Sequence, residues 1–412
     1  MVVFDKRRAD KGRARASGKG LGKLGRYELL HPLGCGGMAE VFKARASGPA
    51  GFERDVVVKR ILPQYTRDPD FVRMFADEAR ILGLMHHPNV VQAYEFGEDG
   101  GTLYLALEYI EGPSLSKILR TLRAANRPMP PVMVAYIARE ICRALDYVHR
   151  LEDSDGDRLD VVHRDVTPSN IIVTPSGAVK LLDFGVAKFA TSAKSTRAGT
   201  VKGKPAYLAP EQLQGKPIDG RVDLFALGIV MHEMLTLQHL FAGDSDVHTA
   251  KKIMEMKIPS IVARREDVPA DLEQIVMRAL ERDRKRRFAT AAEMARALDD
   301  FVLASQLHVE DVAAFIREVE EMSGPPRLVY VNPERRPAGT DEAATRRDRG
   351  MRLRMTARRM RTPRFAAVAA LVLTMIGLGA AFGLHTSTAA AKATVTAPGA
   401  PAAAAVAATA AR

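Results

Sequence analysis

The spacing of apolar residues changes once along this 412-residue chain, and the change limits the possible fold more than any other feature. Before residue 111, short β-branched or alternating segments predict strands at 27–30, 39–45, 55–61 and 103–110. One predicted helix, at 71–84, lies among them. After Pro113 the apolar spacing is helical, notably in 131–149, 222–237 and 270–280. The sequence therefore predicts an α+β protein in which a small strand-rich part precedes a larger helical part.

Basic charge is concentrated near the two ends of the chain. The formal net charge is +12, but residues 1–26 hold nine Lys and Arg against two Asp, and residues 346–364 hold nine Arg against one Asp. Most of the chain between them is slightly acidic, which argues against a nucleic-acid-binding core. Because residues 1–26 contain no apolar run, we expect a basic disordered arm and no signal peptide there. The two cysteines cannot build a disulfide framework, which suits a reducing compartment.

Residues 365–384 form a run of 20 residues without a charged side chain, which is the length of a transmembrane helix. The arginines before it predict that this end stays in the cytoplasm, so we expect a single-pass protein of the inner (cytoplasmic) membrane. A buried core helix is the alternative, since Ala and Gly make the run only moderately hydrophobic. Before the span, 303–364 should form a helix and an Arg-rich juxtamembrane linker, and 385–412 a short Ala-rich external tail. Contact with membrane lipid and a homodimer through Gly379 and Gly383 are compatible with this arrangement.

A glycine-rich segment lies between the first two predicted strands. Glycines let backbone N–H groups approach phosphates closely. The segment comprises Leu33, Gly34, Cys35, Gly36, Gly37, Met38, Ala39, Glu40 and Val41. Alone it is a weak signal, because Gly-rich turns are common. It gains force from Lys59 on a following strand, a cation that can pair with ATP phosphates, and from Glu78 on the next helix, which is placed to anchor that cation.

Three further motifs follow in order: His163-Arg-Asp-Val-Thr-Pro-Ser-Asn170, Asp183-Phe-Gly185 and Ala209-Pro-Glu211. Asp165 can accept the proton of an attacking hydroxyl, and Asn170 can bind Mg²⁺ through its carbonyl oxygen. The carboxylate of Asp183 is a hard ligand suited to the same metal. Each motif alone has a structural explanation, such as a capping role for Asp165 or a solvated position for Glu78. Chance does not explain all of them occurring once, in order.

Together these motifs resemble the eukaryotic-type (Hanks-type) protein kinase family over about residues 27–302. The glycine loop, and a single span after the domain, are similar to bacterial membrane-anchored Ser/Thr protein kinases. The resemblance implies a bilobal fold with a β-rich N-lobe (27–110) and a helical C-lobe (111–302). It also implies ATP and Mg²⁺ as the nucleotide and the metal.

The resemblance assigns chemical roles to five residues. Lys59 would hold the α- and β-phosphates of ATP, and Glu78 would orient it. Asp165 would be the catalytic base, and Asn170 and Asp183 would be the metal ligands. Further residues would have binding or structural roles: Leu107 as gatekeeper, Glu108 to Ile110 as the adenine-binding hinge, Asp223 as a brace of the catalytic loop, and Glu211 with Arg287 as a structural ion pair.

Two positions depart from the family pattern near the expected phosphate site. Most Ser/Thr kinases have a lysine where this chain has Thr167, and a threonine where it has Lys204. Because the two side chains touch in the family, we hypothesise that Lys204 supplies the missing ammonium group. A weakened catalytic loop is the alternative. Ala39 in place of a glycine, and Val57 in place of a smaller residue, remove no charge.

The segment 186–208 corresponds to an activation loop. Arg164, before the catalytic aspartate, resembles the arginine of kinases that are switched on by phosphorylation of this loop. The candidate sites are Ser195, Thr196 and Thr200, of which Thr200 has the spacing most similar to the activating threonine of the family. A phosphate there would pair with Arg164 and order the loop. A simple exposed hydroxyl is the alternative interpretation.

The sequence thus predicts a Ser/Thr protein kinase that transfers the γ-phosphate of ATP to protein hydroxyls in bacterial signal transduction. We also expect it to phosphorylate its own activation loop. The alternative is a nucleotide-binding pseudokinase that acts as a scaffold, for which Thr167 argues weakly. A nucleic-acid-binding module built on the basic flanks is a third possibility that the acidic central region disfavours. The expected partners are therefore protein substrates and ATP, with no nucleic acid.

Overall fold

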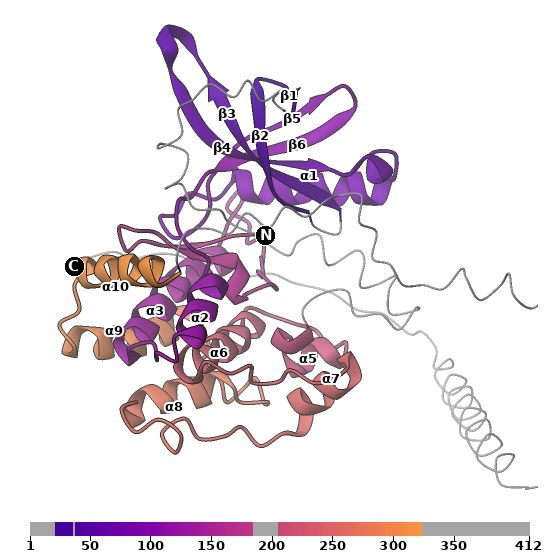
Figure 1. The fold of residues 1–412 in the computed structure, drawn as a ribbon. Coiled ribbons are helices and arrows are strands. Elements are labelled where there is room, and N and C mark those ends of the chain that lie inside the picture. Colours follow the sequence, from indigo (N-terminus) through magenta and orange to yellow (C-terminus); the bar gives the residue numbers. More distant parts are fainter. Residues whose placement is uncertain (1–20, 36–37, 184–204, 324–412) are drawn as a thin grey trace, which may run out of the picture. The chain divides into compact units, whose positions relative to one another are not determined.

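The computed structural model describes residues 21–35, 38–183 and 205–323. The chain divides into two compact units, 1–329 and 330–412, and all described residues belong to the first. This unit consists of a strand-rich N-lobe followed by a helical C-lobe (Figure 1). The predicted bilobal α+β fold is confirmed.

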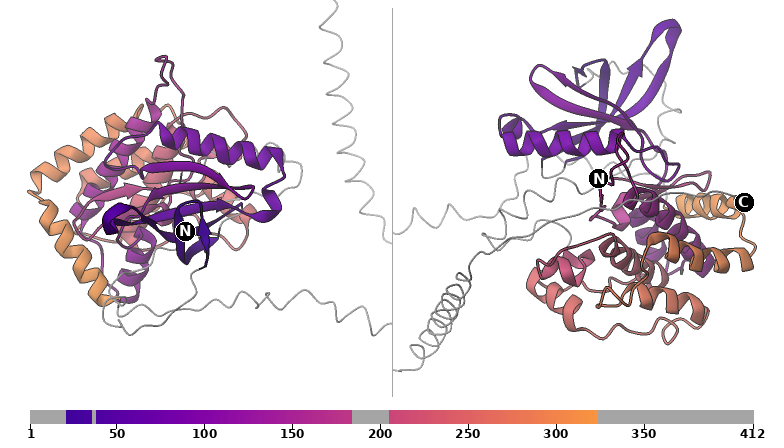
Figure 2. Two further views of the ribbon diagram at one scale, coloured as in Figure 1. Left: turned by 90° about the horizontal axis from the view of Figure 1, so that it is seen from above. Right: turned by 180° about the vertical axis from the view of Figure 1, so that it is seen from behind.

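The N-lobe is built on a six-stranded antiparallel sheet in the order β1-β2-β3-β4-β6-β5. Its strands are β1 (Lys23–Leu24), β2 (Tyr27–Cys35), β3 (Ala39–Ser47), β4 (Glu53–Ile61), β5 (Ala93–Asp99) and β6 (Thr102–Glu108). Helix α1 (Pro69–Gly83) lies along one face of the sheet (Figure 2). The sequence did not predict β5, because none of its side chains is fully buried and no alternation marks it.

Both faces of this sheet are covered. On β4, Val56 and Val58 belong to a small apolar cluster on one face, whereas Val57 joins the main core on the other. Phe75 and Leu82 on the buried side of α1 belong to that main core. The alternating pattern that predicted β4 therefore reflects two different apolar environments.

The first strand extends the N-lobe into the segment that we expected to be a disordered arm. Lys23 and Leu24 pair with β2, and the Leu24 side chain is buried in the small cluster. Arg26 Nη2 lies 2.7 Å from Glu95 Oε2. Residues 23–26 therefore belong to the ordered part of the N-lobe, while the domain boundary that we place at residue 26 stays a prediction.

The C-lobe contains most of the helices. They are α2 (Leu115–Ala124), α3 (Pro131–His149), α5 (Pro210–Leu213), α6 (Arg221–Thr236), α7 (Asp246–Glu255), α8 (Ala270–Ala279), α9 (Ala291–Ala304) and α10 (Val309–Met322). A hairpin of β7 (Ile171–Val173) and β8 (Val179–Leu181) completes the lobe, and 3-10 turns lie at η1 (Pro49–Gly51), η2 (Pro63–Tyr65), η3 (Pro168–Asn170) and η5 (Pro205–Tyr207). Residues 222–235 of α6 are all buried, so this helix forms the centre of the lobe.

Helix α10 follows α9 and packs onto α2. Its apolar residues Val312, Ile316 and Val319 are buried in the main core. A hydrogen bond of 2.9 Å joins the hydroxyls of Thr121 and Ser323, and Arg127 pairs with Glu318. The kinase-domain end that we predict at residue 302 stays a prediction, while the compact unit continues through α10.

No helix of the described part of the chain has the length and hydropathy needed to cross a membrane. The predicted span at 365–384 and the tail that follows it lie outside the described residues.

Candidate active site

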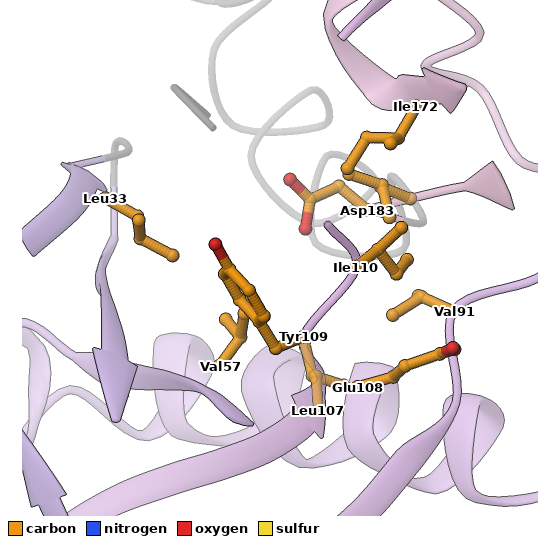
Figure 3. Close-up of a pocket in the computed structure, with 10 residues that line it drawn as sticks. Leu33, Val57, Val91, Leu107, Glu108, Tyr109, Ile110, Ile172 and Asp183 are labelled. Atoms are coloured by element: carbon orange, nitrogen blue, oxygen red, sulfur yellow. The ribbon is translucent and has the colours of Figure 1, made fainter. Parts of the chain in front are cut away.

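A mainly apolar pocket lies between the two lobes (Figure 3). The N-lobe contributes Leu33 from β2 and Val57 from β4, and the segment 107–110 crosses between the lobes. The rest of the lining is Val91, Ile172, Leu182 and Asp183. Figure 3 shows Leu33 and the Asp183 carboxylate on facing sides of this space. Such a slot suits a flat apolar ring that carries a charged or polar substituent.

Side-chain contacts fix the crossing segment in place. Glu108 Oε2 accepts hydrogen bonds from Lys180 Nζ at 2.9 Å and from Gln92 N at 3.3 Å. The ammonium of Lys43 lies 4.3 Å from the ring centroid of Tyr109. The backbone before Ile110 is therefore held at two successive residues.

Lys59 and Glu78 form an ion pair, with 2.5 Å between Nζ and Oε1. The β3–β4 register sets Lys59 opposite Val41, and Glu78 lies on the buried face of α1 with 1% of its surface exposed. The same ammonium is 3.9 Å from Asp183 Oδ1. Burial by itself lowers the pKa of Lys59, but Glu78, Asp183 and Asp165 outweigh it and hold this pKa above its usual value. Lys59 is therefore a fixed cation beside Asp183.

The loop 163–170 brings Asp165 and Asn170 together. The side-chain amide of Asn170 donates to the main-chain oxygen and to Oδ2 of Asp165, both at 2.9 Å. The Leu182 N–H donates to the Asn170 carbonyl at 2.8 Å, and His163 Nε2 is 3.0 Å from the Leu182 carbonyl. These bonds tie the loop to Leu182 and hence to Asp183, which follows it.

Asp223 holds the start of this loop through main-chain groups. It is completely buried on α6 and accepts from the His163 N–H at 2.8 Å and the Arg164 N–H at 2.7 Å. These bonds support Arg164 in a left-handed conformation (φ 64°), which is strained for a residue with a side chain. His149 Nε2 lies 2.8 Å from the same carboxylate. Burial alone raises the pKa of Asp223, but the contacts with His149 and the loop outweigh it and lower this pKa.

Glu211 and Arg287 form a buried bidentate ion pair, with N–O distances of 2.7 and 2.9 Å. Arg287 also donates to the main-chain oxygens of residues 221, 281 and 282. This pair joins the start of α5 to the segment between α8 and α9.

The glycine-rich segment forms the β2–β3 connection. Gly34 pairs with Val41 and Cys35 with Glu40, while Leu33 and Ala39 are buried. The Met38 carbonyl accepts from Leu62 N at 2.9 Å. Gly36 and Gly37 lie outside the described residues.

Several other predicted residues also lie outside the described part of the chain, namely Ser195, Thr196, Thr200 and Lys204. Thr167, the counterpart of Lys204 in our hypothesis, is described. It is 1% exposed, and its hydroxyl has no hydrogen-bond partner among the described residues.

Sequence reasoning missed some residues of the site. Ile172 lies two residues after Asn170, and Leu182 lies directly before Asp183. Their position beside a polar motif was the sequence signal that could have identified them as pocket residues. Val91 and His149 carried no such signal, because each reaches the site only through the fold.

The donor set fits a Mg²⁺ ion that is bound partly by its substrate. Because the amide nitrogen of Asn170 faces Asp165, its oxygen is directed elsewhere, and Asp183 adds a carboxylate. The described residues contain no cluster of three or more His, Cys, Asp or Glu that could hold a metal. Mg²⁺ typically binds one or two protein oxygens together with substrate phosphates. Asn170 and Asp183 meet that requirement.

Comparison with known proteins agrees with this geometry. The model of the protein kinase domain matches residues 27–298. The chain is 41% identical over 278 residues to tyrosine-protein kinase MasK of Myxococcus xanthus, covering 68% of this chain and 43% of that protein. It is 38% identical over 275 residues to serine/threonine-protein kinase PknB of Mycobacterium leprae (65% and 42% covered). It is 32% identical over 319 residues to serine/threonine-protein kinase PrkC of Bacillus subtilis (77% and 47% covered).

The chain therefore spans less than half the length of these relatives. Among solved structures, the PknI kinase domain of Mycobacterium tuberculosis matches with a TM-score of 0.51 and 27% identity, covering 70% of this chain and 98% of that one. A family model that covers most of the chain, and relatives of this identity, agree with the site geometry. This chain belongs to the protein kinase family.

Proposed function

We propose that this chain is a bacterial serine/threonine protein kinase that transfers the γ-phosphate of ATP to hydroxyls of protein substrates. The observation that carries the proposal is the convergence of Lys59, Asp165, Asn170 and Asp183 beside the apolar pocket. In this proposal the pocket holds adenine against the segment 107–110. PknB and PrkC, which are named serine/threonine-protein kinases, support the assignment.

The proposed mechanism depends mainly on alignment and charge. Lys59 pairs with the phosphates and is held by Glu78, while Asp165 accepts the proton of the substrate hydroxyl. Asn170 keeps Asp165 oriented through its two hydrogen bonds. When bound, Mg²⁺ neutralises phosphate charge. Because the transition state of phosphoryl transfer is loose, these contributions need no covalent enzyme intermediate.

The acceptor residue needs a direct test, because the relative from Myxococcus xanthus is named a tyrosine-protein kinase. The full chain is incubated with labelled ATP, Mg²⁺ and a generic basic protein, and the labelled product is hydrolysed to phosphoamino acids. We expect phosphoserine and phosphothreonine. A product that contains only phosphotyrosine contradicts the serine/threonine assignment.

The control for this experiment is Asp165→Asn, which keeps the shape of the side chain and removes the base. We expect it to lose transfer by about 100-fold or more. A nucleotide-binding scaffold is the second candidate, favoured by Thr167 in place of a lysine. Binding of ATP by the unaltered chain without transfer to any protein selects the scaffold.

We also propose that the chain phosphorylates its own segment 186–208, with Thr200, Thr196 and Ser195 as the candidate sites. Burial lowers the pKa of Arg164 to about 10, so a phosphate placed near this half-buried guanidinium would stabilise its charge. Mass spectrometry of the active protein should find phosphate at one of these three residues. Active protein without it contradicts the proposal.

For the C-terminal part we propose a single membrane span at 365–384, with the kinase domain on the cytoplasmic side. The support is the uncharged run and the nine arginines before it. Fractionation of the native host should find the full chain with the membrane and a chain ending at residue 345 in the soluble fraction. An equal distribution of both contradicts the span.

A further inference from the structure

A second groove, of about 400 Å³, lies in the C-lobe beside the catalytic loop. Pro168 and Ser169 of that loop form one wall, and η5 with Tyr207 forms another. Arg123 and Ser116 from α2, Glu233 from α6 and His239 add to its polar lining. Asp165 precedes Pro168 by only a few residues of the same loop, so the groove lies beside the loop that carries the proposed base.

The one carboxylate in the groove is already engaged. Glu233 is 1% exposed, its Oε2 accepts from the Tyr207 hydroxyl at 2.8 Å, and its Oε1 lies 2.9 Å from His239 Nδ1. Burial, together with the charge of Glu233, raises the pKa of Tyr207, so the phenol stays a donor. Both oxygens of Glu233 therefore serve the fold, and the groove offers no other carboxylate among the described residues to attract a basic side chain.

The cation in the groove is anchored by a main-chain oxygen and forms no ion pair with a described residue. Arg123 is exposed, and its Nε donates to the carbonyl of Leu237 at 2.7 Å. Leu237 follows α6 in a left-handed conformation that turns this carbonyl toward α2. The two terminal nitrogens of Arg123 have no hydrogen-bond partner among the described residues. A guanidinium held in this way presents a planar fork that fits a carboxylate.

We propose that this groove binds an acidic side chain of the protein substrate, an Asp or Glu near the acceptor hydroxyl, and that Arg123 is the residue that selects it. This inference rests on the proposed kinase function and narrows its substrate class. An extended peptide advances about 3.3 Å per residue, so only side chains close to the acceptor can enter a groove beside the catalytic loop. Most of the lining is uncharged, so the contact of Arg123 with the carboxylate determines the preference.

The test uses the full chain and a serine peptide in a neutral background, with Asp, Ala or Arg placed in turn at each flanking position. At one position Asp should lower the peptide KM about fivefold relative to Ala, a size typical of a partly exposed, charge-assisted contact. Arg123→Ala should remove this preference, and Arg123→Glu should turn it toward the Arg peptide. Arg120→Ala is the matched control, because Arg120 is exposed on the same helix and does not line the groove.

A second readout separates this proposal from the kinase function. Peptides with Ala in place of the acceptor serine cannot be phosphorylated, so their binding is measured by fluorescence anisotropy without any turnover. If the acidic peptide binds in an Arg123-dependent way but the chain transfers no phosphate, the groove proposal stands and the kinase assignment fails. If the chain transfers phosphate with equal KM values for the Asp and Ala peptides, or prefers the Arg peptide, the proposed acidic preference of the groove is wrong. An unchanged KM for ATP shows that each variant is folded, and Arg123→Lys, which keeps the charge without the fork, should retain part of the preference.

Discussion

The two lobes hold their charged groups by different means. In the N-lobe, Lys59 is held by the side chain of Glu78, which belongs to a separate helix. In the C-lobe, Asp223 and Arg287 bond mainly to main-chain N–H and carbonyl groups of neighbouring segments. Main-chain groups are fixed by the fold, whereas a pair of side chains can separate without unfolding it. We therefore expect the bidentate pair of the C-lobe to serve stability and the single-contact pair of the N-lobe to serve activity.

The largest effect should come from breaking the C-lobe pair. Arg287→Ala leaves Glu211 buried without its partner and removes donors from three main-chain carbonyls. We expect the free energy of unfolding to fall by about 3–5 kcal/mol, the range for an uncompensated buried charge. Urea unfolding of the full chain measures it. Arg286→Ala, at the exposed neighbouring position, should change it by less than about 0.5 kcal/mol. A loss for Arg287→Ala as small as that of the control would break the comparison.

Acid should weaken the C-lobe through His232 on α6. This residue is 1% exposed, its Nε2 has no hydrogen-bond partner within the described residues, and burial lowers its pKa from 6.5 to about 4. Between pH 6.5 and 4 the unfolded chain binds a proton that the folded chain does not. With respect to this group, the free energy of unfolding is therefore highest above pH 6.5, and it falls by about 3 kcal/mol as the pH drops to 4.

Urea unfolding at several pH values measures this dependence. His232→Leu should flatten it, because the variant has no proton to bind at that position. His248→Gln, at an exposed position, should leave the slope unchanged. If the slope of His232→Leu equals that of the unaltered chain, the acid sensitivity arises from another group.

Breaking the N-lobe pair should affect activity more than folding. Glu78→Gln leaves Lys59 with Asp183 at 3.9 Å as its nearest charged partner, so the ammonium can turn toward that carboxylate. We expect kcat/KM to fall about 100-fold, while the free energy of unfolding changes by about 1 kcal/mol. Asp77→Asn, one residue earlier and exposed on α1, is the control for both measurements. A loss of stability as large as that of Arg287→Ala would remove the distinction between the lobes.

The sequence predicted most of what depends on local pattern. The strands around Lys59 and the long helices were recognisable because their apolar spacing matches the faces that they bury. The motif residues were recognisable because their side-chain chemistry is specific. By contrast, β1 is too short to show any alternation, and Leu24 is buried only because the sheet is already formed.

Contacts between distant segments could not be predicted in the same way. His149 contacts Asp223, which lies 74 positions later in the sequence, and no local sequence pattern near either residue predicts this contact. The groove lined by Arg123 was missed for a related reason. Its guanidinium is positioned by the main-chain oxygen of Leu237, and a carbonyl has no sequence signature.

The smallest expected effect concerns Thr167, in the lobe where contacts are otherwise fixed by the fold. Its hydroxyl is buried and has no hydrogen-bond partner among the described residues. Thr167 therefore does not supply the positive charge that a lysine would bring to this position. If Lys204, which lies outside those residues, supplies the ammonium instead, Lys204→Ala should lower kcat about tenfold, or about 1.4 kcal/mol in the barrier.

The reciprocal exchange, Thr167→Lys with Lys204→Thr, should restore most of that loss, and Thr167→Val should change kcat little. Steady-state transfer to a generic substrate measures all three. Full activity in Lys204→Ala would mean that Lys59 supplies the ammonium charge without help from the C-lobe. Restoration by the double exchange would instead show that the C-lobe contributes a cation through a side chain, in addition to its main-chain contacts. The two lobes would then both supply positive charge to the phosphate, and they would differ only in how each cation is held.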